Sequence, residues 1–275
     1  PGGNMDIIVR ENYEEMSRYA AQVIADMVRS KPDCVLGLAT GSTPIGTYKE
    51  LVRMHKEEGL DFSQVKTFNL DEYLGVGLNL DNPYDLDQSY ARFMHEELFK
   101  HINIKKENIH IPDGLTKDPV QHCKWYEEEI KKAGGIDLQL LGIGADGHWA
   151  FNEPGSSLAS RTRVQALSSQ TLDDNYESFY KKAGIERSKM PHFALTMGIG
   201  TILEARSLLM IANGRKKAAI VAQAIEGPVT SQVTASAIQL YPGKATVVLD
   251  KEAASMLKNL DYYIHVEKLK REYGL

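Results

Sequence analysis

The sequence predicts a single α/β domain with an open, mainly parallel sheet and helices on both faces. Strand-like apolar runs alternate with helix-like segments, and neither an internal repeat nor a low-complexity linker separates them. Of the 275 residues, 43% are hydrophobic and 25% are charged, as in a soluble globular protein that buries a large core. Residues 5–275 are assigned to this domain. Residues 1–4 are interpreted as a segment added ahead of a natural start at Met5.

Composition excludes several classes of function. No segment approaches the ~18 apolar residues of a membrane span, and the first residues have no signal-peptide character. Cys34 and Cys123 lie in no metal-ligand spacing, so a reduced, cytoplasmic setting is expected. The net charge of −5 without a dense basic block argues against nucleic acid or a membrane surface as partner. A negatively charged small ligand therefore needs local positive groups.

The apolar pattern predicts the elements in order. Strands are expected at residues 7–9, 34–38, 65–70, 136–143, 193–197, 207–212 and 245–249. Helices are expected at residues 13–29, 45–58, 90–101, 119–133, 215–226 and 252–271. Thr43 and Asp118 are the expected N-caps of two helices, because a proline follows each at the first helical position. Residues 156–191 are polar and weakly periodic, which predicts either a mobile lid, roughly at 167–190, or a plain surface excursion.

Three titratable side chains follow the strand predicted at 136–143. Asp146, His148 and Glu153 lie in a glycine-containing stretch that can turn sharply at the end of that strand. Ligands of open parallel sheets bind beyond the carboxyl ends of the strands. An imidazole between two acids can be oriented by one and have its pKa tuned by both, which favours proton transfer. A structural histidine is the alternative, and a metal site is weaker because no paired-histidine or cysteine cluster supports it.

Further candidates lie at the ends of other strands. The turn at Gly41, Ser42 and Thr43 offers backbone N–H groups, hydroxyls and a helix N-terminus to a phosphate, although an ordinary strand–helix turn is equally compatible. It matches neither nucleotide-binding glycine motif. Lys217, in the first turn of a later helix, is either a phosphate contact or a plain exposed lysine. Asp71 follows the strand at 65–70 and is either a general base or the start of a solvated acidic loop.

Taken together, three stretches resemble the glucosamine-6-phosphate deaminase family. They are residues 38–44 (Leu-Ala-Thr-Gly-Ser-Thr-Pro), 68–73 (Phe-Asn-Leu-Asp-Glu-Tyr) and 142–163. They stand in the family's order, and the likeness extends from Met5 to about Leu249. It implies a modified Rossmann-like fold and the conversion of glucosamine 6-phosphate and water to fructose 6-phosphate and ammonia, with no metal or organic cofactor.

The resemblance also implies roles for the candidate residues. His148, held and polarised by Asp146 and Glu153, would open the sugar ring, and Asp71 would move a proton from carbon 2 to carbon 1. The substrate phosphate would lie on the turn of Gly41, Ser42 and Thr43 with Lys217, and Tyr90 would line the site. Ser157 and Arg163 match residues that bind an allosteric activator, N-acetylglucosamine 6-phosphate, in hexameric members. Other members are monomers, so both states remain open.

This chain departs from the family pattern at several positions. Glu177 stands where a lid arginine is usual, so either the lid brings Lys181 or Lys182 inward or phosphate binding is weaker. Gln165 replaces an effector-binding lysine, which argues against strong activation. The loop before Ser89 carries extra residues around 84–87, and alanine replaces a histidine after Tyr90. Two other functions remain as alternatives, a 6-phosphogluconolactonase-like hydrolase and a non-catalytic sugar-phosphate sensor.

Overall fold

Seven parallel strands form the central sheet of the computed structural model, which describes residue 3 and residues 5–77 and 88–275. Their order across the sheet is β1-β10-β9-β6-β2-β3-β5. The strands are β1 (Met5–Arg10), β2 (Val35–Leu38), β3 (Lys66–Asn69), β5 (Ile109–His110), β6 (Leu138–Leu141), β9 (Ser207–Ala212) and β10 (Lys244–Asp250). Every pairing within this sheet is parallel. The predicted α/β class is confirmed.

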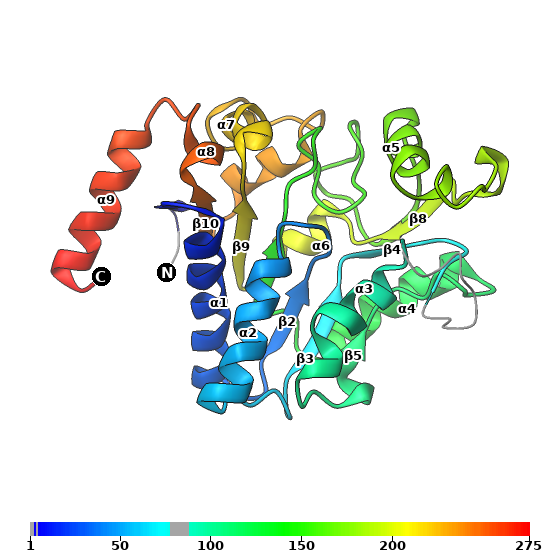
Figure 1. Cartoon of the computed structure of the whole chain (residues 1–275), viewed down its shortest axis with the longest axis horizontal. Helices are drawn as coiled ribbons and strands as arrows, with labels where there is room; N and C mark the ends of the chain where they lie inside the picture. The colour runs from blue at the N-terminus through cyan, green and yellow to red at the C-terminus, as the bar shows by residue number, and fades with distance from the viewer. Residues whose placement is uncertain (1–2, 4, 78–87) are drawn as a thin grey trace.

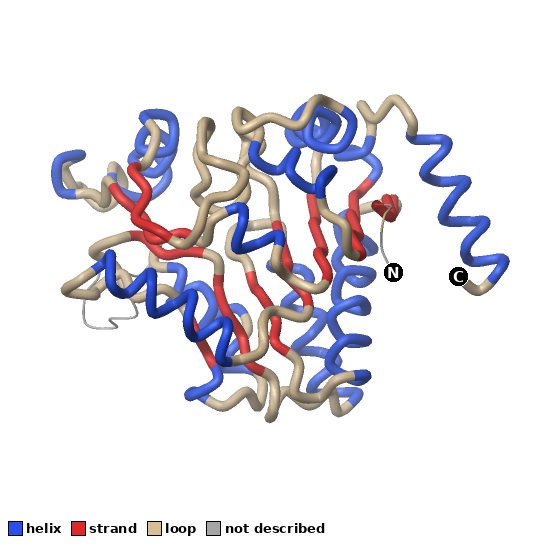
Figure 2. The backbone as a smooth tube through the Cα atoms, turned by 180° about the vertical axis from the view of Figure 1, so that it is seen from behind, coloured by secondary structure: helices blue, strands red, loops and turns tan. Residues whose placement is uncertain are grey.

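Helices cover both faces of this sheet. On one face lie α1 (Tyr13–Ser30), α2 (Ile45–Glu58) and α3 (Tyr90–Glu97), and on the other lie α4 (Pro119–Lys132) and α6 (Ile199–Leu203) (Figures 1 and 2). β2 and β6 are buried along their whole length, as their apolar sequences require. The sheet order reverses between them, because the chain runs outward from β2 to β5 before returning to β6. A crevice at such a reversal is the usual ligand site of an open α/β sheet.

A second, smaller sheet lies beside the first and was not predicted. It contains β4 (Asp71–Tyr73), β8 (Phe193–Thr196) and β7 (Arg163–Ala166), paired antiparallel in the order β4-β8-β7. Residues 71–73 were expected to begin a loop, but they pair with β8 after the chain leaves β3 at Leu70. β8 falls within the strand expected at 193–197, but β4 and β7 have only three and four residues, too few for an alternating pattern to show in the sequence. Thr196 pairs with Asp71 on one side and Arg163 on the other, so these three side chains share one face.

The cap predictions had different outcomes. Asp118 caps α4 as expected, accepting a hydrogen bond from the Gln121 amide. The expected cap of α2 is wrong, because α2 begins after Pro44 without a side-chain cap. The Thr43 hydroxyl instead donates to Asn213 Oδ1 at 2.9 Å. Residue 213 follows β9, so this hydrogen bond joins the loops after two different strands.

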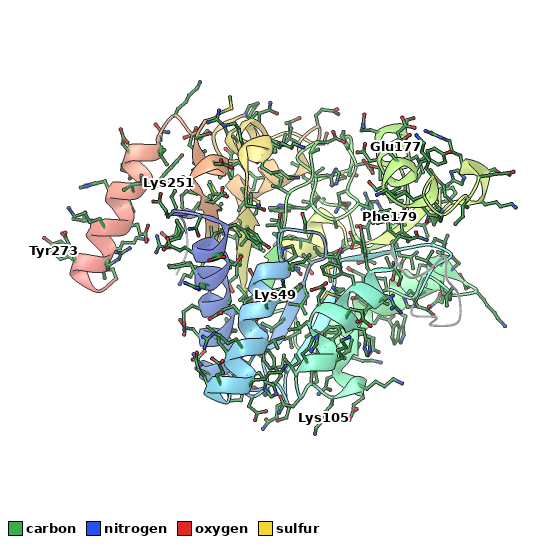
Figure 3. All side chains as sticks on the ribbon, viewed as in Figure 1. Lys49, Lys105, Glu177, Phe179, Lys251 and Tyr273 are labelled. Carbon is green, nitrogen blue, oxygen red and sulfur yellow. The ribbon has the colours of Figure 1, made fainter. Side chains whose placement is uncertain are left out.

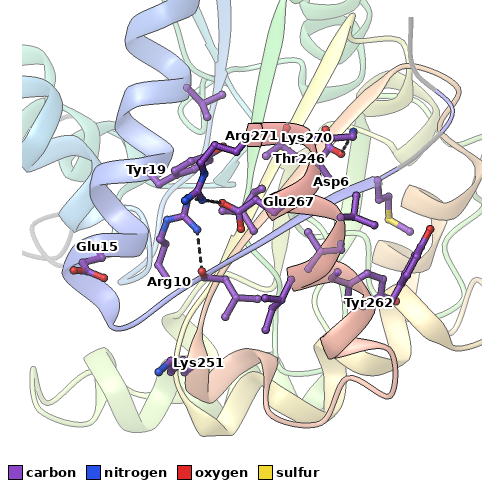
Figure 4. A pocket seen from close by; sticks show the side chains of 18 of the residues that line it. Asp6, Arg10, Glu15, Tyr19, Thr246, Lys251, Tyr262, Glu267, Lys270 and Arg271 are labelled. Carbon is purple, nitrogen blue, oxygen red and sulfur yellow. Dashed lines mark hydrogen bonds and ion pairs between the residues drawn. The ribbon is translucent and has the colours of Figure 1, made fainter. Parts of the chain in front are cut away.

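The C-terminal helix expected at 252–271 is interrupted. It forms α8 (Lys251–Ala254) and α9 (Leu260–Tyr273), because Leu257 inserts into the core and the Glu226 carboxylate accepts hydrogen bonds from the amides of Lys258 and Asn259. α9 has no buried residue and lies beside the edge strand β1, held by ion pairs such as Arg10–Glu267 at 2.6 Å. A cavity of about 1030 Å³ lies between β1, α1 and α9 (Figure 4). Among the described residues, no helix has the length and apolar character to cross a bilayer.

Candidate active site

Asp146, His148 and Glu153 come together in the loop that follows β6. One potential ligand or proton-transfer atom from each lies within 4.8 Å of the others. Among the described residues, this is the one cluster of three or more such side chains with that spacing. The structure thus brings these three predicted site residues together. A cluster of one imidazole and two carboxylates can relay a proton or hold a cation, and the three atoms alone do not distinguish these roles.

The His148 ring packs directly against the backbone of Gly144. A Cβ atom at residue 144 would lie 2.3 Å from Nε2 of His148, so only glycine leaves room for the ring. The Gly144 amide also donates to the His148 carbonyl at 2.9 Å, which closes the loop around the ring. Burial lowers the pKa of His148; the carboxylates of Glu153 and Asp146 oppose this shift, and the charge of Lys217 adds to it. The imidazole is therefore biased toward its neutral form, which can accept a proton.

Glu153 connects this cluster to the lid predicted at 167–190. That segment contains α5 (Ser169–Asn175) and a π-helical turn, Tyr176–Tyr180. The Thr171 hydroxyl on α5 donates to Glu153 Oε1 at 2.9 Å, while Oε2 of Glu153 is buried without a hydrogen-bond partner among the described residues. From the other side, the Tyr73 hydroxyl donates to Asn175 Oδ1 at 3.3 Å. The segment is thus docked over the polar loop.

Asp71 lies on β4, across the small sheet from Thr196. The Thr196 hydroxyl accepts a hydrogen bond from the Phe151 amide at 3.1 Å, so the strand that pairs with Asp71 also holds the loop of His148. The Asp71 side chain is buried, and no described residue hydrogen bonds to its carboxylate. Burial, and after it the charge of Glu72, raises the pKa of Asp71 well above its ordinary value. A carboxylate with a raised pKa is a stronger base than a solvated one.

Aromatic side chains form one wall next to Asp71. Tyr90, at the start of α3, stacks on Phe151 with ring centroids 5.8 Å apart, and its hydroxyl lies 3.4 Å from that of Tyr73. The ring centroids of Tyr73 and Phe151 lie 5.1 Å apart. Tyr90, predicted to line the site, thus lies against Phe151 in the loop that carries His148. Tyr73 and Phe151 were not singled out from the sequence, where each reads as an ordinary apolar residue.

The predicted phosphate turn follows β2 and Lys217 follows β9, and these two strands flank β6 in the sheet. Gly41 adopts a φ of 108°, a conformation that favours glycine, and Ser42 is exposed. Lys217 Nζ donates to the Ile143 carbonyl at 2.6 Å, directly after β6, and burial lowers the pKa of the amine. Thr43 bonds to Asn213 as described above. The fold therefore brings the loops after β2, β6 and β9 together, with the Lys217 amine bonded to the loop after β6.

Glu177, which stands where the resemblance implies a lid arginine, forms an ion pair on the surface of the molecule. Glu177 is 58% exposed and pairs with Lys181 at 3.1 Å, and Lys182 is also exposed. Figure 3 places Glu177 and Phe179 at the end of the molecule opposite Tyr273. The interpretation in which Lys181 or Lys182 turns inward to replace the arginine is therefore wrong for this conformation. The loop residues 84–87 lie outside the described residues.

Ser157 and Arg163 line a separate hollow of about 480 Å³ next to the catalytic loop. The Arg163 guanidinium donates to Asn152 Oδ1 at 2.9 Å, Ser156 Oγ at 2.9 Å and Gln165 Oε1 at 3.0 Å. Burial lowers the pKa of Arg163. Gln165 stands where the resemblance implies a lysine. It accepts a hydrogen bond that Arg163 could otherwise donate to a ligand.

The fold and this geometry agree with comparisons to known proteins. Residues 10–248 match the model of a family described as glucosamine-6-phosphate isomerases/6-phosphogluconolactonase. A glucosamine-6-phosphate deaminase of Thermoanaerobacter pseudethanolicus is 48% identical, with 94% of this chain and 97% of that protein aligned. One of Shewanella woodyi is 46% identical, with 96% of this chain and 95% of that protein aligned.

Solved structures show the same relationship. A monomeric glucosamine-6-phosphate deaminase superposes with a TM-score of 0.83 at 42% identity, covering 92% of this chain and all of that one. A 6-phosphogluconolactonase from Trypanosoma cruzi superposes with a TM-score of 0.70 at 22% identity over 94% of this chain and 98% of that one, which shows a shared fold. The chain belongs to the family of glucosamine-6-phosphate isomerases and 6-phosphogluconolactonases.

Proposed function

We propose that this chain converts glucosamine 6-phosphate and water to fructose 6-phosphate and ammonia. The observation that carries the proposal is the presence of two distinct acid–base centres at the same end of the sheet. One is the cluster of Asp146, His148 and Glu153, and the other is the buried carboxylate of Asp71, to which no described residue donates a hydrogen bond. Opening a sugar ring and moving a proton between carbons are two separate proton transfers, so this reaction uses both centres. Hydrolysis of a lactone needs one base to activate water and leaves Asp71 without a role.

The first step assigned to the site is ring opening. His148 takes the proton of the anomeric hydroxyl and returns a proton to the ring oxygen, so that the bond between carbon 1 and the ring oxygen breaks and the aldehyde forms. Its lowered pKa favours the neutral ring that starts this exchange. Glu153 and Asp146 stabilise the imidazolium that forms transiently. Thr171 fixes Glu153 for this purpose.

Isomerisation and deamination follow. Asp71 removes the proton from carbon 2 while oxygen 1 takes up a proton from water, which gives an enolamine. Asp71 then delivers its proton to carbon 1, and the amine nitrogen releases a proton to water as the imine at carbon 2 forms. Water adds to that imine, the carbon–nitrogen bond breaks, and the ketose and ammonia result. The raised pKa of Asp71 makes it a stronger base toward the weakly acidic C–H bond.

The phosphate of the substrate is assigned to the turn of Gly41, Ser42 and Thr43, with Lys217 as the charged partner. For Lys217 to reach the phosphate, its amine exchanges the Ile143 carbonyl for a phosphate oxygen. Because Glu177 stands in the lid where a cation would add a second charged contact, we expect weaker phosphate binding than in relatives with that arginine. No metal enters this mechanism.

We further propose that the protein works as a monomer in the cytoplasm with little activation at the Ser157–Arg163 hollow. The monomeric deaminase that superposes on this chain supports the first assignment. Both cysteines are free and buried, which suits a reducing compartment. The hydrogen bond between Arg163 and Gln165 supports the assignment of little activation. An anionic effector would have to displace Gln165 from Arg163 and would find no second cation at residue 165.

A coupled assay tests the proposed reaction. The purified chain is incubated with glucosamine 6-phosphate, and fructose 6-phosphate and ammonia are measured separately. We expect the two products in equal amounts, since one amine is lost for each ketose formed. A chain that binds the substrate without forming either product would be a sensor, and the proposal would be wrong.

A further inference from the structure

We propose that Glu72 is a positioning residue for the reaction: its buried carboxylate fixes the start of α3, and with it Tyr90, and places a negative charge with no ion-pair partner among the described residues next to Asp71. This inference rests on the proposed role of Asp71 as the base. Nothing in the sequence separates Glu72 from a plain acidic loop residue. Its contacts in the structure do.

The Glu72 carboxylate is completely buried and accepts four hydrogen bonds. Oε1 accepts from the amides of Tyr73 at 2.9 Å and Tyr90 at 3.0 Å. Oε2 accepts from the Ala91 amide at 2.8 Å and the Ser89 hydroxyl at 3.2 Å. These donors include the first amides of α3, which otherwise lack partners at a helix N-terminus. One carboxylate therefore joins β4 to α3.

The surrounding backbone is shaped around this carboxylate. A Cβ atom at Gly114 would lie 2.1 Å and 2.2 Å from the carbonyl oxygens of Val76 and Tyr73, and 3.2 Å from Cγ of Glu72. Because residue 114 is glycine, the loop before α4 can close over β4 and exclude solvent from Glu72. The anchoring matters for Tyr90, since α3 begins at that residue and its ring forms part of the wall next to Asp71.

The charge of Glu72 raises the pKa of Asp71. In the described part of the chain, the titratable groups that interact electrostatically with Asp71 include Glu72 and Tyr73 on β4, Tyr90 on α3 and Tyr126 on α4. None of them is a cation. Burial raises the pKa of Glu72 to about 7, while its four hydrogen bonds lower it. Asp71 has no such donors among the described residues, so Glu72 is the carboxylate that stays charged and Asp71 is the one that binds the proton first.

Two effects on catalysis follow. The negative neighbour strengthens Asp71 as a base, and the anchored helix holds the tyrosine wall against which the sugar must lie. The position of the acid limb separates these effects, because the charge of Glu72 changes the pH at which Asp71 ionises whereas a loss of anchoring changes the rate. Glu72→Gln removes the charge, and its amide nitrogen cannot accept the hydrogen bonds that one of the two carboxylate oxygens accepts. Glu72→Asp keeps the charge but is too short to reach all four donors.

The experiment measures kcat and kcat/KM for glucosamine 6-phosphate against pH in wild type, Glu72→Gln and Glu72→Asp. In Glu72→Gln we expect the acid limb to move to lower pH by about half a unit or more, with a plateau kcat about tenfold lower because the base is weaker. In Glu72→Asp the limb should stay in place while kcat falls. Glu96→Gln, the same substitution at a partly exposed α3 position paired with Lys100, is the control and should match wild type.

An unmoved acid limb in Glu72→Gln would overturn the proposal. If that variant does not fold, Glu72→Asp decides: reduced kcat with an unmoved limb supports the role, and wild-type kcat overturns it. The proposed function is tested independently by wild-type turnover, so a failure of the reaction is distinguishable from a failure of this inference.

Titration of the Asp71 carboxyl by ¹³C NMR gives a readout that needs no activity. The Asp71 signal is assigned through its loss in Asp71→Asn. The Asp71 pKa should fall in Glu72→Gln.

Discussion

At the scale of single residues, Asp71 combines a catalytic advantage with a cost in stability. Its carboxylate is buried without a hydrogen-bond donor among the described residues, and Glu72 adds a like charge beside it. The pKa of Asp71 in the folded protein therefore exceeds the value of about 3.9 expected in an unfolded chain. At pH values between the unfolded and the folded pKa of Asp71, the folded state binds more protons than the unfolded state. The free energy of unfolding therefore falls as the pH rises through this interval, and Asp71 does not affect it at lower pH.

Replacement of Asp71 by asparagine should separate these two consequences. We expect Asp71→Asn to abolish turnover while largely retaining substrate binding, because the shape remains and the base is lost. Thermal unfolding should occur a few degrees higher than in wild type at pH 8, at about 2–4 °C per kcal/mol for a chain of this size, and the difference should shrink at pH 5. Unchanged turnover, or a lower melting temperature at pH 8, would contradict the assignment.

Gly144 offers a second residue-level test. A methyl group at this position would collide with the His148 ring, so Gly144→Ala should displace the imidazole and lower kcat about 100-fold or more. Gly142→Ala is the matched control, because a Cβ there meets no atom within 4 Å and neither glycine has a positive φ. Steady-state kinetics of the two variants decide the point. Equal losses in both would mean that the fit between Gly144 and His148 is unimportant.

The catalytic candidates could be predicted from the sequence because each follows a strand-like run. Asp71, Asp146, His148 and Glu153 all lie just after an apolar segment, where parallel sheets present their ligands. Glu72, Thr171 and Asn175 could not be predicted in this way. Their contacts reach across 18 residues for Glu72 with Tyr90 and for Thr171 with Glu153, and across 102 for Asn175 with Tyr73. No local pattern carries such pairings.

At the scale of elements, the small sheet and α5 couple the acid–base groups to the lid. β7 leads directly into α5, which holds Glu153 through Thr171 and meets Tyr73 of β4 through Asn175. The segment predicted as a lid, roughly 167–190, is thus docked through two polar anchors. Its movement stays a prediction.

Removal of the Thr171 hydroxyl tests this coupling. In Thr171→Val, Oε1 of Glu153 loses its donor while Oε2 already has none among the described residues, so the carboxylate should shift and kcat should fall about tenfold. Ser178→Ala, which removes an exposed hydroxyl from the same lid, should leave the rate unchanged. The lid would have no part in positioning Glu153 if Thr171→Val retained the full rate.

Elements with strong local signals were predicted well, and the others were not. α1, α2 and α4 match the expected ranges within one residue because their apolar spacing and flanking residues agree. β5 has two residues and β4 has three, so neither has room for a pattern. The interruption between α8 and α9 depends on Glu226 and Leu257, which act through contacts that the helical spacing of residues 252–271 does not reveal.

At the scale of the whole molecule, the sheet order explains how distant residues form one site. The loops after β2, β6 and β9 meet at the reversal of strand order, and β4 adds Asp71 from the small sheet. The chain carries a net charge of −5, so the overall field does not attract an anionic sugar phosphate, and the proposed contact with Lys217 would have to supply the attraction. α9 stands apart from this end of the molecule and takes no part in the proposed chemistry (Figure 1).

The central claim is that this arrangement performs isomerisation with deamination. It is tested most directly by comparing kcat/KM of the purified wild-type chain for glucosamine 6-phosphate and for 6-phosphogluconolactone, both with EDTA present. We predict formation of fructose 6-phosphate and ammonia at least about 100-fold more efficient than lactone hydrolysis, with no loss on chelation, because only deamination uses Asp71 as well as the His148 cluster. Faster hydrolysis of the lactone, or deamination that EDTA abolishes, would contradict the account.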